Sequence, residues 1–304
     1  MSRAFVVAGA VVLALLPGSG VGTAGQPCPT VSRVARSVAP GELVLLTVAC
    51  TTPLQKIEVT AFGRSIPFYE AETPRAWQGL VGIDLNTKPG KHEVAIVGRA
   101  GSSTFTRTYT LAVAPKRFRT RQLTVPQQFV TPPESERARI EQEAKRVGAI
   151  IATITPVRLW EGPFVPPVPG PMISPFGTLS VLNGTPGSRH GGADFQAAEG
   201  TPIQAPAAGR VVLAADLYFS GRTVIIDHGL GLISLLAHLS EIRAREGAHV
   251  ARGDEVGTVG STGRVTGPHL HWTVRVVGAR VDPLSLLAVL GPKGGRLPGA
   301  VACR

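Results

Sequence analysis

The amino-acid sequence predicts a mainly β protein with two domains joined by one linker helix. Its 304 residues suffice for two compact domains, each with a core of its own. Between residues 26 and 115, short apolar runs alternate with turn sequences such as Pro40-Gly41. A second β-rich region covers residues 171–290, and a single helical pattern separates the two.

The first region shows the regular spacing of an Ig-like β-sandwich. Five short strands are expected there, with turn residues such as Lys88-Pro89-Gly90 between them: 42–48, 56–61, 77–84, 92–97 and 104–113. No residue in this region belongs to a recognisable catalytic cluster. We therefore expect the domain to position or shield the other one, with a plain spacer as the alternative.

The linker, residues 116–170, contains the helix and a proline-rich connector. The helix is expected over residues 132–147, with Glu134 near its positive amino end and Gly148 after its last turn. Residues 162–170 are rich in proline, which predicts a semi-rigid spacer.

The amino terminus has the pattern of a secretory signal peptide. Arg3 precedes an apolar run from Ala4 to Leu16, and small residues follow up to Ala24. The apolar run is shorter than the roughly 20 residues that cross a bilayer. These features predict a signal peptide over residues 1–24, a mature chain without a membrane span, and a periplasmic or secreted location.

Three cysteines are compatible with an oxidising compartment. Cys28 and Cys50 flank the first expected strands, and a disulfide between them would add about 3 kcal/mol of stability in the chain-entropy model. Cys303 lies in the expected tail, residues 291–304, and would be a free or intermolecular thiol. A link from Cys303 to either of the other two is the alternative.

The formal net charge is +11, or about +10 once Arg3 is removed with the signal peptide. Such a surplus attracts polyanions, which outside the cytoplasm include anionic envelope polymers. The signal peptide and the scattered arginines argue against nucleic acid as a partner. An arginine-rich composition without any partner is the alternative.

Two short motifs predict a metal site. His190 and Asp194 flank Gly191-Gly192, and about 75 residues later come His269 and His271. A His, Asp and His set suits zinc, and three protein ligands leave the fourth tetrahedral position open, as in catalytic sites. His269 and His271 would project from one face of a strand. An extended chain would separate His190 from Asp194 by roughly 13 Å, so the glycines are expected to fold the backbone back.

The surrounding sequence resembles the lysostaphin/LytM-type family of zinc endopeptidases, which cut peptide bonds in bacterial peptidoglycan. The resemblance runs from about Ser174 to Leu287. The matching segments, in chain order, are Ser174-Pro175-Phe176-Gly177, 190–195, 200–209, Val224-Ile225-Ile226-Asp227-His228-Gly229, Ala237-His238-Leu239-Ser240, 260–272 and Val281-Asp282-Pro283.

The resemblance implies an antiparallel β-sheet catalytic domain over residues 171–290, with peptidoglycan as its substrate. By position, it implies one Zn²⁺ per chain held by His190, Asp194 and His271. His238 and His269 correspond to the family's two further catalytic histidines. In this scheme a zinc-activated water attacks the peptide bond, while the two histidines orient and deprotonate that water.

One residue departs from the family pattern. Leu236 stands where the family commonly has a tyrosine, two residues before His238. Strand alternation would put both residues on one face, so the change is expected to alter the cleft floor or the turnover rate without removing a ligand or a base.

Parts of the sequence are compatible with two other functions. A non-catalytic cell-wall regulator that activates another wall hydrolase is the alternative, because some relatives have lost metal ligands. Residues 202–211 also resemble biotinyl and lipoyl carrier domains, but no lysine lies between Gly200 and Pro283, which excludes a carrier. The first domain and the linker helix are further expected to cover the cleft and keep the enzyme latent.

The remaining candidates have structural interpretations. His228 is expected in a turn after a strand, His249 at a solvated strand start, and His92 on the surface. Asn183 could contact a substrate, but Asn183-Gly184 is foremost a turn sequence.

Overall fold

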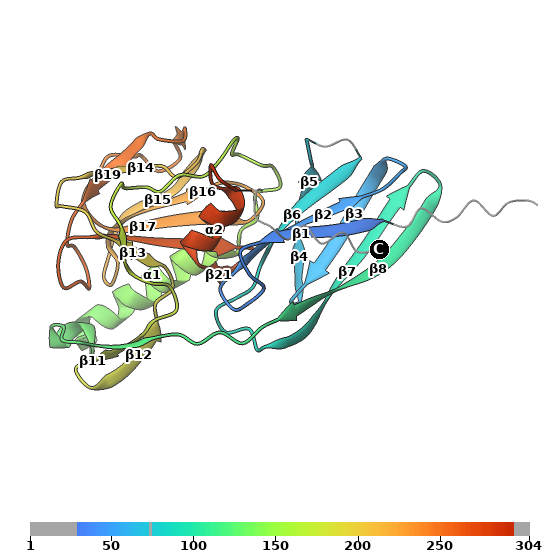
Figure 1. The fold of residues 1–304 in the computed structure, drawn as a ribbon. Helices are drawn as coiled ribbons and strands as arrows, with labels where there is room; N and C mark the ends of the chain where they lie inside the picture. Colours follow the sequence, from blue (N-terminus) through green and yellow to red (C-terminus); the bar gives the residue numbers. More distant parts are fainter. Residues whose placement is uncertain (1–28, 73–74, 295–304) are drawn as a thin grey trace, which may run out of the picture.

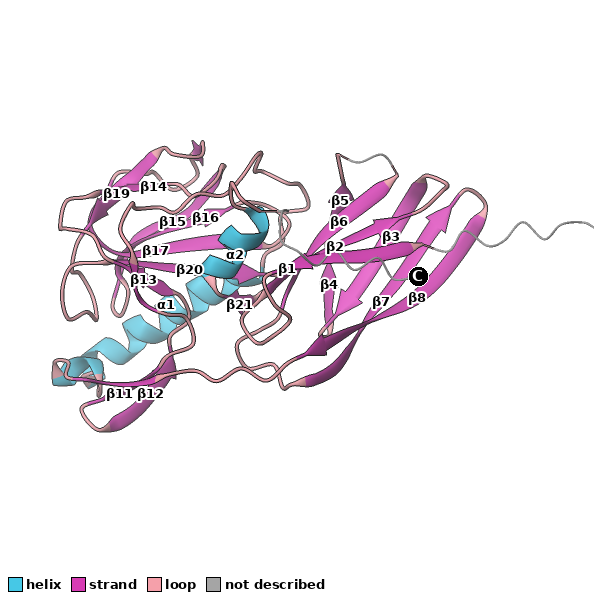
Figure 2. Cartoon of the chain, in the orientation of Figure 1, coloured by secondary structure: helices cyan, strands magenta, loops and turns pink. Residues whose placement is uncertain are grey.

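The computed structural model describes residues 29–72 and 75–294 (Figure 1). It confirms a mainly β fold, and antiparallel pairing dominates the sheets (Figure 2). The expected signal peptide, Cys28 and Cys303 lie outside the described residues, so export and the disulfide pairing stay predictions. No helix within the described ranges combines the length and the apolar character needed to cross a bilayer.

The amino-terminal region contains two four-stranded antiparallel sheets within the described residues. The first has the order β1 (Thr30–Ala35), β2 (Leu43–Ala49), β6 (Ala76–Gly82), β5 (Phe68–Glu70). The second has the order β4 (Arg64–Ile66), β3 (Leu54–Ala61), β7 (Gly90–Ala100), β8 (Ser103–Val113). Strand β7 alternates buried Val94 and Ile96 with exposed residues, because side chains of a strand point to opposite faces. A strand lies at each of the five predicted places, while the Ig-like assignment stays a prediction.

The carboxy-terminal region is built on a ten-stranded sheet. Its main order is β10 (Met172–Ser174), β13 (Ala193–Phe195), β20 (Leu270–Val276), β17 (Leu232–Ile242), β16 (Gly221–Asp227), β15 (Gly209–Leu217), β18 (His249–Val250). Three more strands attach beside it, β14 (Pro202–Gln204), β19 (Glu255–Val259) and β21 (Ala279–Val281). The run Val224-Ile225-Ile226 is fully buried, because both faces of the sheet are covered. Helix α2 (Pro283–Leu290) follows. The Asp282 carboxylate caps its amino end by accepting a hydrogen bond from the Leu284 N–H.

Helix α1 (Glu134–Ala152) is longer than predicted at its carboxyl end. It begins after Pro133 and continues four residues past Gly148, where the sequence predicted its end. The extension lets Ile150 join Val147 against an apolar cluster on the sheet, made of Leu213, Leu217, Ile225 and Ile233. Glycine inside a helix costs about 1 kcal/mol relative to alanine, which this packing outweighs.

The proline-rich connector is not the semi-rigid spacer that the sequence predicted. The Phe164 N–H donates to Leu290 O at 2.8 Å, and the Val165 N–H donates to Pro206 O at 2.9 Å. Phe164 and Val168 are buried in the main core. The apolar residues between the prolines therefore fasten the connector to the sheet.

The two regions meet at α2 and the end of the sheet. Arg36 pairs with Asp282 at 2.6 Å, and Arg280 pairs with Asp84 at 2.7 Å. The Leu43 N–H also donates to Ser285 Oγ at 2.9 Å. The buried apolar residues form one continuous core through this junction, so the regions are packed together rather than merely tethered.

His228 lies in the core behind the sheet, in the turn after β16 as predicted. Its Nδ1–H donates to Ala208 O at 2.8 Å, and Nε2 lies 2.9 Å from Ser234 Oγ. Burial lowers the pKa of His228 to about 4, against an ordinary value of 6.5. The folded protein therefore holds this imidazole neutral at pH values where the unfolded chain protonates it.

His228 should make the fold sensitive to mild acid. As the pH falls from about 6.5 to about 4, the unfolded state takes up a proton that the folded state does not, so the free energy of unfolding decreases. The expected loss is up to about 3 kcal/mol. Urea unfolding with a chelator at pH 7, 5.5 and 4.5 measures it. The His228→Gln variant should lose less stability over this range but keep part of the pH dependence, because the pKa values of His238 and His271 are lowered as well. His249→Gln, at an exposed site, should keep all of it. An equal loss of unfolding free energy with falling pH in all three proteins would contradict the assignment.

Candidate metal centre and active-site cleft

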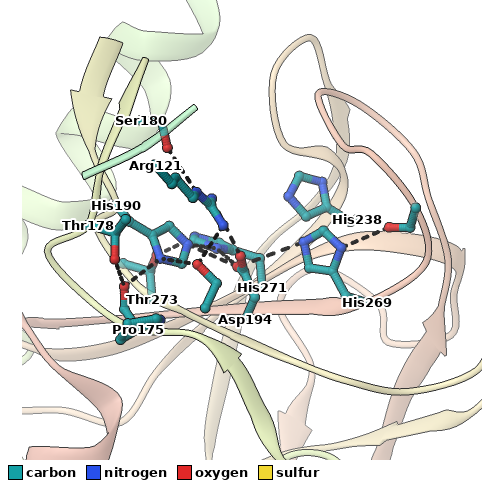
Figure 3. A network of polar contacts seen from close by, with 12 residues as sticks. Arg121, Pro175, Thr178, Ser180, His190, Asp194, His238, His269, His271 and Thr273 are labelled. Carbon is teal, nitrogen blue, oxygen red and sulfur yellow. Dashed lines mark hydrogen bonds and ion pairs between the residues drawn. The ribbon is translucent and has the colours of Figure 1, made fainter. Parts of the chain in front are cut away.

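Three of the predicted site residues come together on neighbouring strands. His190 directly follows β12 (Thr185–Arg189), Asp194 is the middle residue of β13, and His271 lies on β20. Asp194 and His271 are cross-strand partners in the antiparallel β13–β20 pair. Figure 3 shows their side chains converging on one point.

The donor atoms of this trio fit a tetrahedral zinc ion. His190 Nε2 lies 2.9 Å from Asp194 Oδ1, and His271 Nδ1 lies 2.8 Å from the same oxygen. The two histidine nitrogens are 3.0 Å apart. Ligands about 2.0–2.1 Å from zinc in a tetrahedron are separated by about 3.3 Å, so a small outward shift would accommodate the ion. The trio can also hold a metal by its chemistry, two imidazoles and one carboxylate.

The outer nitrogen of each of the two imidazoles also has a polar contact. His190 Nδ1–H donates to Pro175 O at 3.2 Å, and His271 Nε2 lies 2.9 Å from Thr273 Oγ1. Both inner nitrogens contact Asp194 in this structure. If a metal took the place of those contacts, the outer contacts could keep the proton on the outer nitrogen of each ring, as a metal ligand requires.

The charge states of the trio also suit a cation. Burial raises the pKa of Asp194, but hydrogen bonds from His190 and His271 outweigh it and place the pKa well below its ordinary range. Burial lowers the pKa of His271, and the charge of His190 adds to this effect. An ionised Asp194 beside a His271 ring that favours its neutral form suits zinc binding.

His238 and His269 lie beside the trio. The ring centroids of His238 and His269 are 5.1 Å apart, and His238 is 5.7 Å from His271. His238 Nδ1–H donates to Thr262 O at 2.9 Å, and His269 Nδ1–H donates to Gly267 O at 2.8 Å. Each ring is therefore held through Nδ1 and keeps Nε2 free for other contacts. His269 Nε2 is 3.7 Å from Asp194 Oδ1.

Burial, with the charges of His271 and His269, lowers the pKa of His238 to about 3. At neutral pH its ring is therefore uncharged and can accept a hydrogen bond.

Comparison with known proteins agrees with this geometry. The model of peptidase family M23 matches residues 188–283, the segment that carries all five site residues. A solved structure of a Pseudomonas aeruginosa protein assigned to peptidase M23 is 33% identical, with a TM-score of 0.65. The match covers 83% of this chain and 96% of that one. The chain belongs to peptidase family M23.

Curated M23 relatives include peptidoglycan enzymes. The DD-carboxypeptidase/endopeptidase Mpg of Neisseria meningitidis is 43% identical over 97 residues, 32% of this chain and 22% of the relative. The peptidoglycan DD-endopeptidase ShyA of Vibrio cholerae is 40% identical over 95 residues, 31% of this chain and 22% of the relative. This chain thus matches only about a fifth of the length of these proteins.

The prediction that Leu236 shares a face with His238 at the cleft floor is wrong. Leu236 pairs with Trp272 and is buried in the core, whereas the next residue, Ala237, pairs with the cleft residue His271. His238 has a positive φ of 67°, and this left-handed residue interrupts the strand alternation that would have placed 236 and 238 on one face. Leu236 is therefore not part of the cleft floor.

The prediction that Gly191 and Gly192 fold the backbone back through φ values special to glycine is also wrong. Neither glycine has a positive φ. A Cβ on Gly192 would lie 2.3 Å from Trp272 O and 2.8 Å from Thr273 Oγ1. The glycine therefore allows β13 to approach β20 closely, which is what brings Asp194 next to His271.

The site lies in a cleft of about 340 Å³, and the sequence did not predict all of the residues that line it. One wall includes residues from the linker, where β9 (Thr120–Leu123) runs parallel to β11 (Leu179–Leu182). Arg121 reaches from β9 to within 3.9 Å of Asp194 Oδ2 (Figure 3). No motif signals Arg121, because it lies 73 residues before Asp194 outside the family segment. In the described part of the chain, no residue of the two amino-terminal sheets or of α1 lines this cleft, so the expected cover is not found.

The other histidines and Asn183 lie mostly as predicted. His249 is exposed at the start of β18, and Asn183 forms the β11–β12 turn with a φ of 49°. The Asn183 side chain also exchanges hydrogen bonds with the Val125 backbone, at 3.0 Å and 2.9 Å, which holds the linker against the cleft wall. His92 is half-buried rather than exposed, because its ring packs on Phe62.

Proposed function

We propose that this M23 protein is a zinc-dependent endopeptidase that hydrolyses peptide bonds in bacterial peptidoglycan. The observation that carries the proposal is the convergence of His190, Asp194 and His271, with donor atoms 2.8–3.0 Å apart in an open cleft. Three ligands with cleft space beside them are typical of catalytic rather than structural zinc sites.

The neighbouring histidines have the positions that this chemistry needs. Zinc bound by the trio would supply a polarised water and a Lewis acid for the peptide carbonyl. His238 and His269 expose Nε2 beside the trio, where they can orient a nucleophile, take its proton and return one to the leaving amine. Thr262 O and Gly267 O fix both rings by accepting their Nδ1–H groups.

The names of the relatives support the substrate and the compartment. ShyA is named for action on peptidoglycan, which lies outside the cytoplasm, and Mpg is named as a DD-carboxypeptidase and endopeptidase. An exported chain with a net charge of +11 would also meet anionic envelope polymers there. We therefore place the protein in the periplasm or outside the cell.

A regulator that only activates another wall hydrolase is the second candidate. A 34% identical relative, the cell division protein DipM of Caulobacter vibrioides, matches over 163 residues and is not named as an enzyme. The complete set of ligand-type residues in this chain favours catalysis, because a regulator has no need of them.

Digestion of purified cross-linked peptidoglycan tests the proposal. The zinc-loaded mature chain should release fragments with new amino termini, read by mass spectrometry. Treatment with a chelator should stop the release, and added zinc should restore it. Zinc bound at one ion per chain without any cleavage would contradict the enzyme and favour the regulator.

A further inference from the structure

Three arginine side chains from separate segments line the cleft. Arg121 lies on β9, Arg189 ends β12, and Arg264 lies beside Phe219 in a separate loop. Among the described residues, Asp194 is the only acidic residue in this lining, and it belongs to the predicted metal trio. The space around the predicted metal centre is therefore strongly cationic.

The Arg264 guanidinium has no acidic partner among the described residues. Its guanidinium stacks on the Phe219 ring, 4.8 Å from the centroid, and burial lowers its pKa without removing its charge. Within residues 29–72 and 75–294, no carboxylate forms an ion pair with it. A half-buried charge without a partner is costly, and a ligand carboxylate would offset that cost.

The loop that carries Arg264 is fixed before any ligand arrives. The Arg264 N–H donates to Phe219 O at 2.8 Å, and Thr262 Oγ1 accepts from the Arg222 N–H at 2.9 Å. Gly221 and Gly263 pack backbone to backbone, since a Cβ on Gly263 would lie 2.4 Å from Gly221 N. A preorganised side chain loses less entropy on binding a ligand.

Arg121 is held in place on β9 of the cleft lining. Its Nε donates to Ser180 Oγ at 3.1 Å, and Nη1 donates to Ser174 Oγ at 2.8 Å. Nη2, 3.9 Å from Asp194 Oδ2, is the end of the fork nearest the predicted metal centre. A group bound beside the trio would therefore lie within reach of this guanidinium.

We propose that Arg264 and Arg121 bind free carboxylates that flank the scissile peptide bond, so that the preferred substrate is an anionic peptide. Guanidinium groups suit this task because their planar fork matches a carboxylate. A peptide whose residues at the scissile bond are uncharged, such as an oligoglycine bridge, offers them no partner. This assignment rests on the proposed endopeptidase function and specifies its substrate class.

The test uses two synthetic branched peptides of one sequence. One carries free carboxylates on the residues flanking the central amide, and the other carries carboxamides there. Calorimetric titration of the chelator-treated full chain should give at least about tenfold tighter binding of the carboxylate peptide. With zinc restored, kcat/KM should show the same preference, and pentaglycine should be a poor substrate.

The variants assign the preference to the two arginines. The double substitution Arg264→Gln with Arg121→Gln should reduce the preference to within about twofold. Arg264→Lys should retain part of it, and Arg99→Gln, on exposed β7, should retain all of it. Thermal unfolding of each variant verifies the fold.

The outcomes separate the two proposals. Equal binding of both peptides, or an undiminished preference in the double variant, would overturn the arginine assignment even if hydrolysis proceeds. A preference that depends on the arginines but comes without hydrolysis of either peptide would overturn the endopeptidase and leave the carboxylate site standing.

Discussion

Replacing His271 by alanine is expected to abolish zinc binding and peptidoglycan hydrolysis together. Replacing His238 by alanine is instead expected to lower kcat by roughly 10²–10⁴-fold with the metal still bound. The contrast follows from geometry. His271 Nδ1 lies 2.8 Å from Asp194 Oδ1 and 3.0 Å from His190 Nε2, so it is part of the predicted ligand set. His238 is bonded to Thr262 O and lies outside that set.

Zinc content by mass spectrometry and turnover on cross-linked peptidoglycan measure the two effects on the same samples. His249→Ala is the matched control, because His249 is an exposed histidine at the start of β18. Loss of zinc from His238→Ala, or full turnover by that variant, would show that the roles are assigned wrongly.

The site could be predicted from the sequence because its parts are local. His269 and His271 share a face through strand alternation, and the sequences around each histidine resemble a known family over more than a hundred residues. The structure adds the register that no local pattern gives, such as Asp194 opposite His271.

The errors have a common physical cause, since each depends on contacts between distant segments. The face of Leu236 changes because His238 adopts a left-handed backbone held by its N–H on Ser220 O. Helix α1 passes Gly148 because the sheet offers an apolar surface. Arg121 enters the cleft because β9 pairs with β11 far along the chain. Local propensity is overridden in each case.

The linker packs against the M23 region, and this changes what a truncation should do. A fragment of residues 160–304 is expected to be less stable than a fragment of residues 116–304, and no more active than the mature chain. The shorter fragment loses α1 and thereby uncovers Leu213, Leu217, Ile225 and Ile233. Exposing part of four such side chains costs on the order of 3–6 kcal/mol, or roughly 10 °C in Tm.

Polar contacts between α1 and the cleft wall add to this effect. Glu143 Oε2 accepts from the Tyr218 N–H at 2.8 Å, and Arg146 pairs with Glu246 at 2.8 Å. Tyr218 directly precedes Phe219 and Ser220, which line the cleft. Removal of α1 should therefore loosen this wall, and removal of β9 takes Arg121 from the cleft lining.

Thermal unfolding and turnover of the two fragments test the expectation. Both lack the amino-terminal sheets, so their difference isolates residues 116–159. A latent enzyme covered by its linker would behave in the opposite way, with the 160–304 fragment faster than the full mature chain. Since α1 and the amino-terminal sheets do not line the cleft in the described residues, we expect the shorter fragment to be the slower one. A faster and equally stable 160–304 fragment would show that the linker inhibits the site rather than completing it.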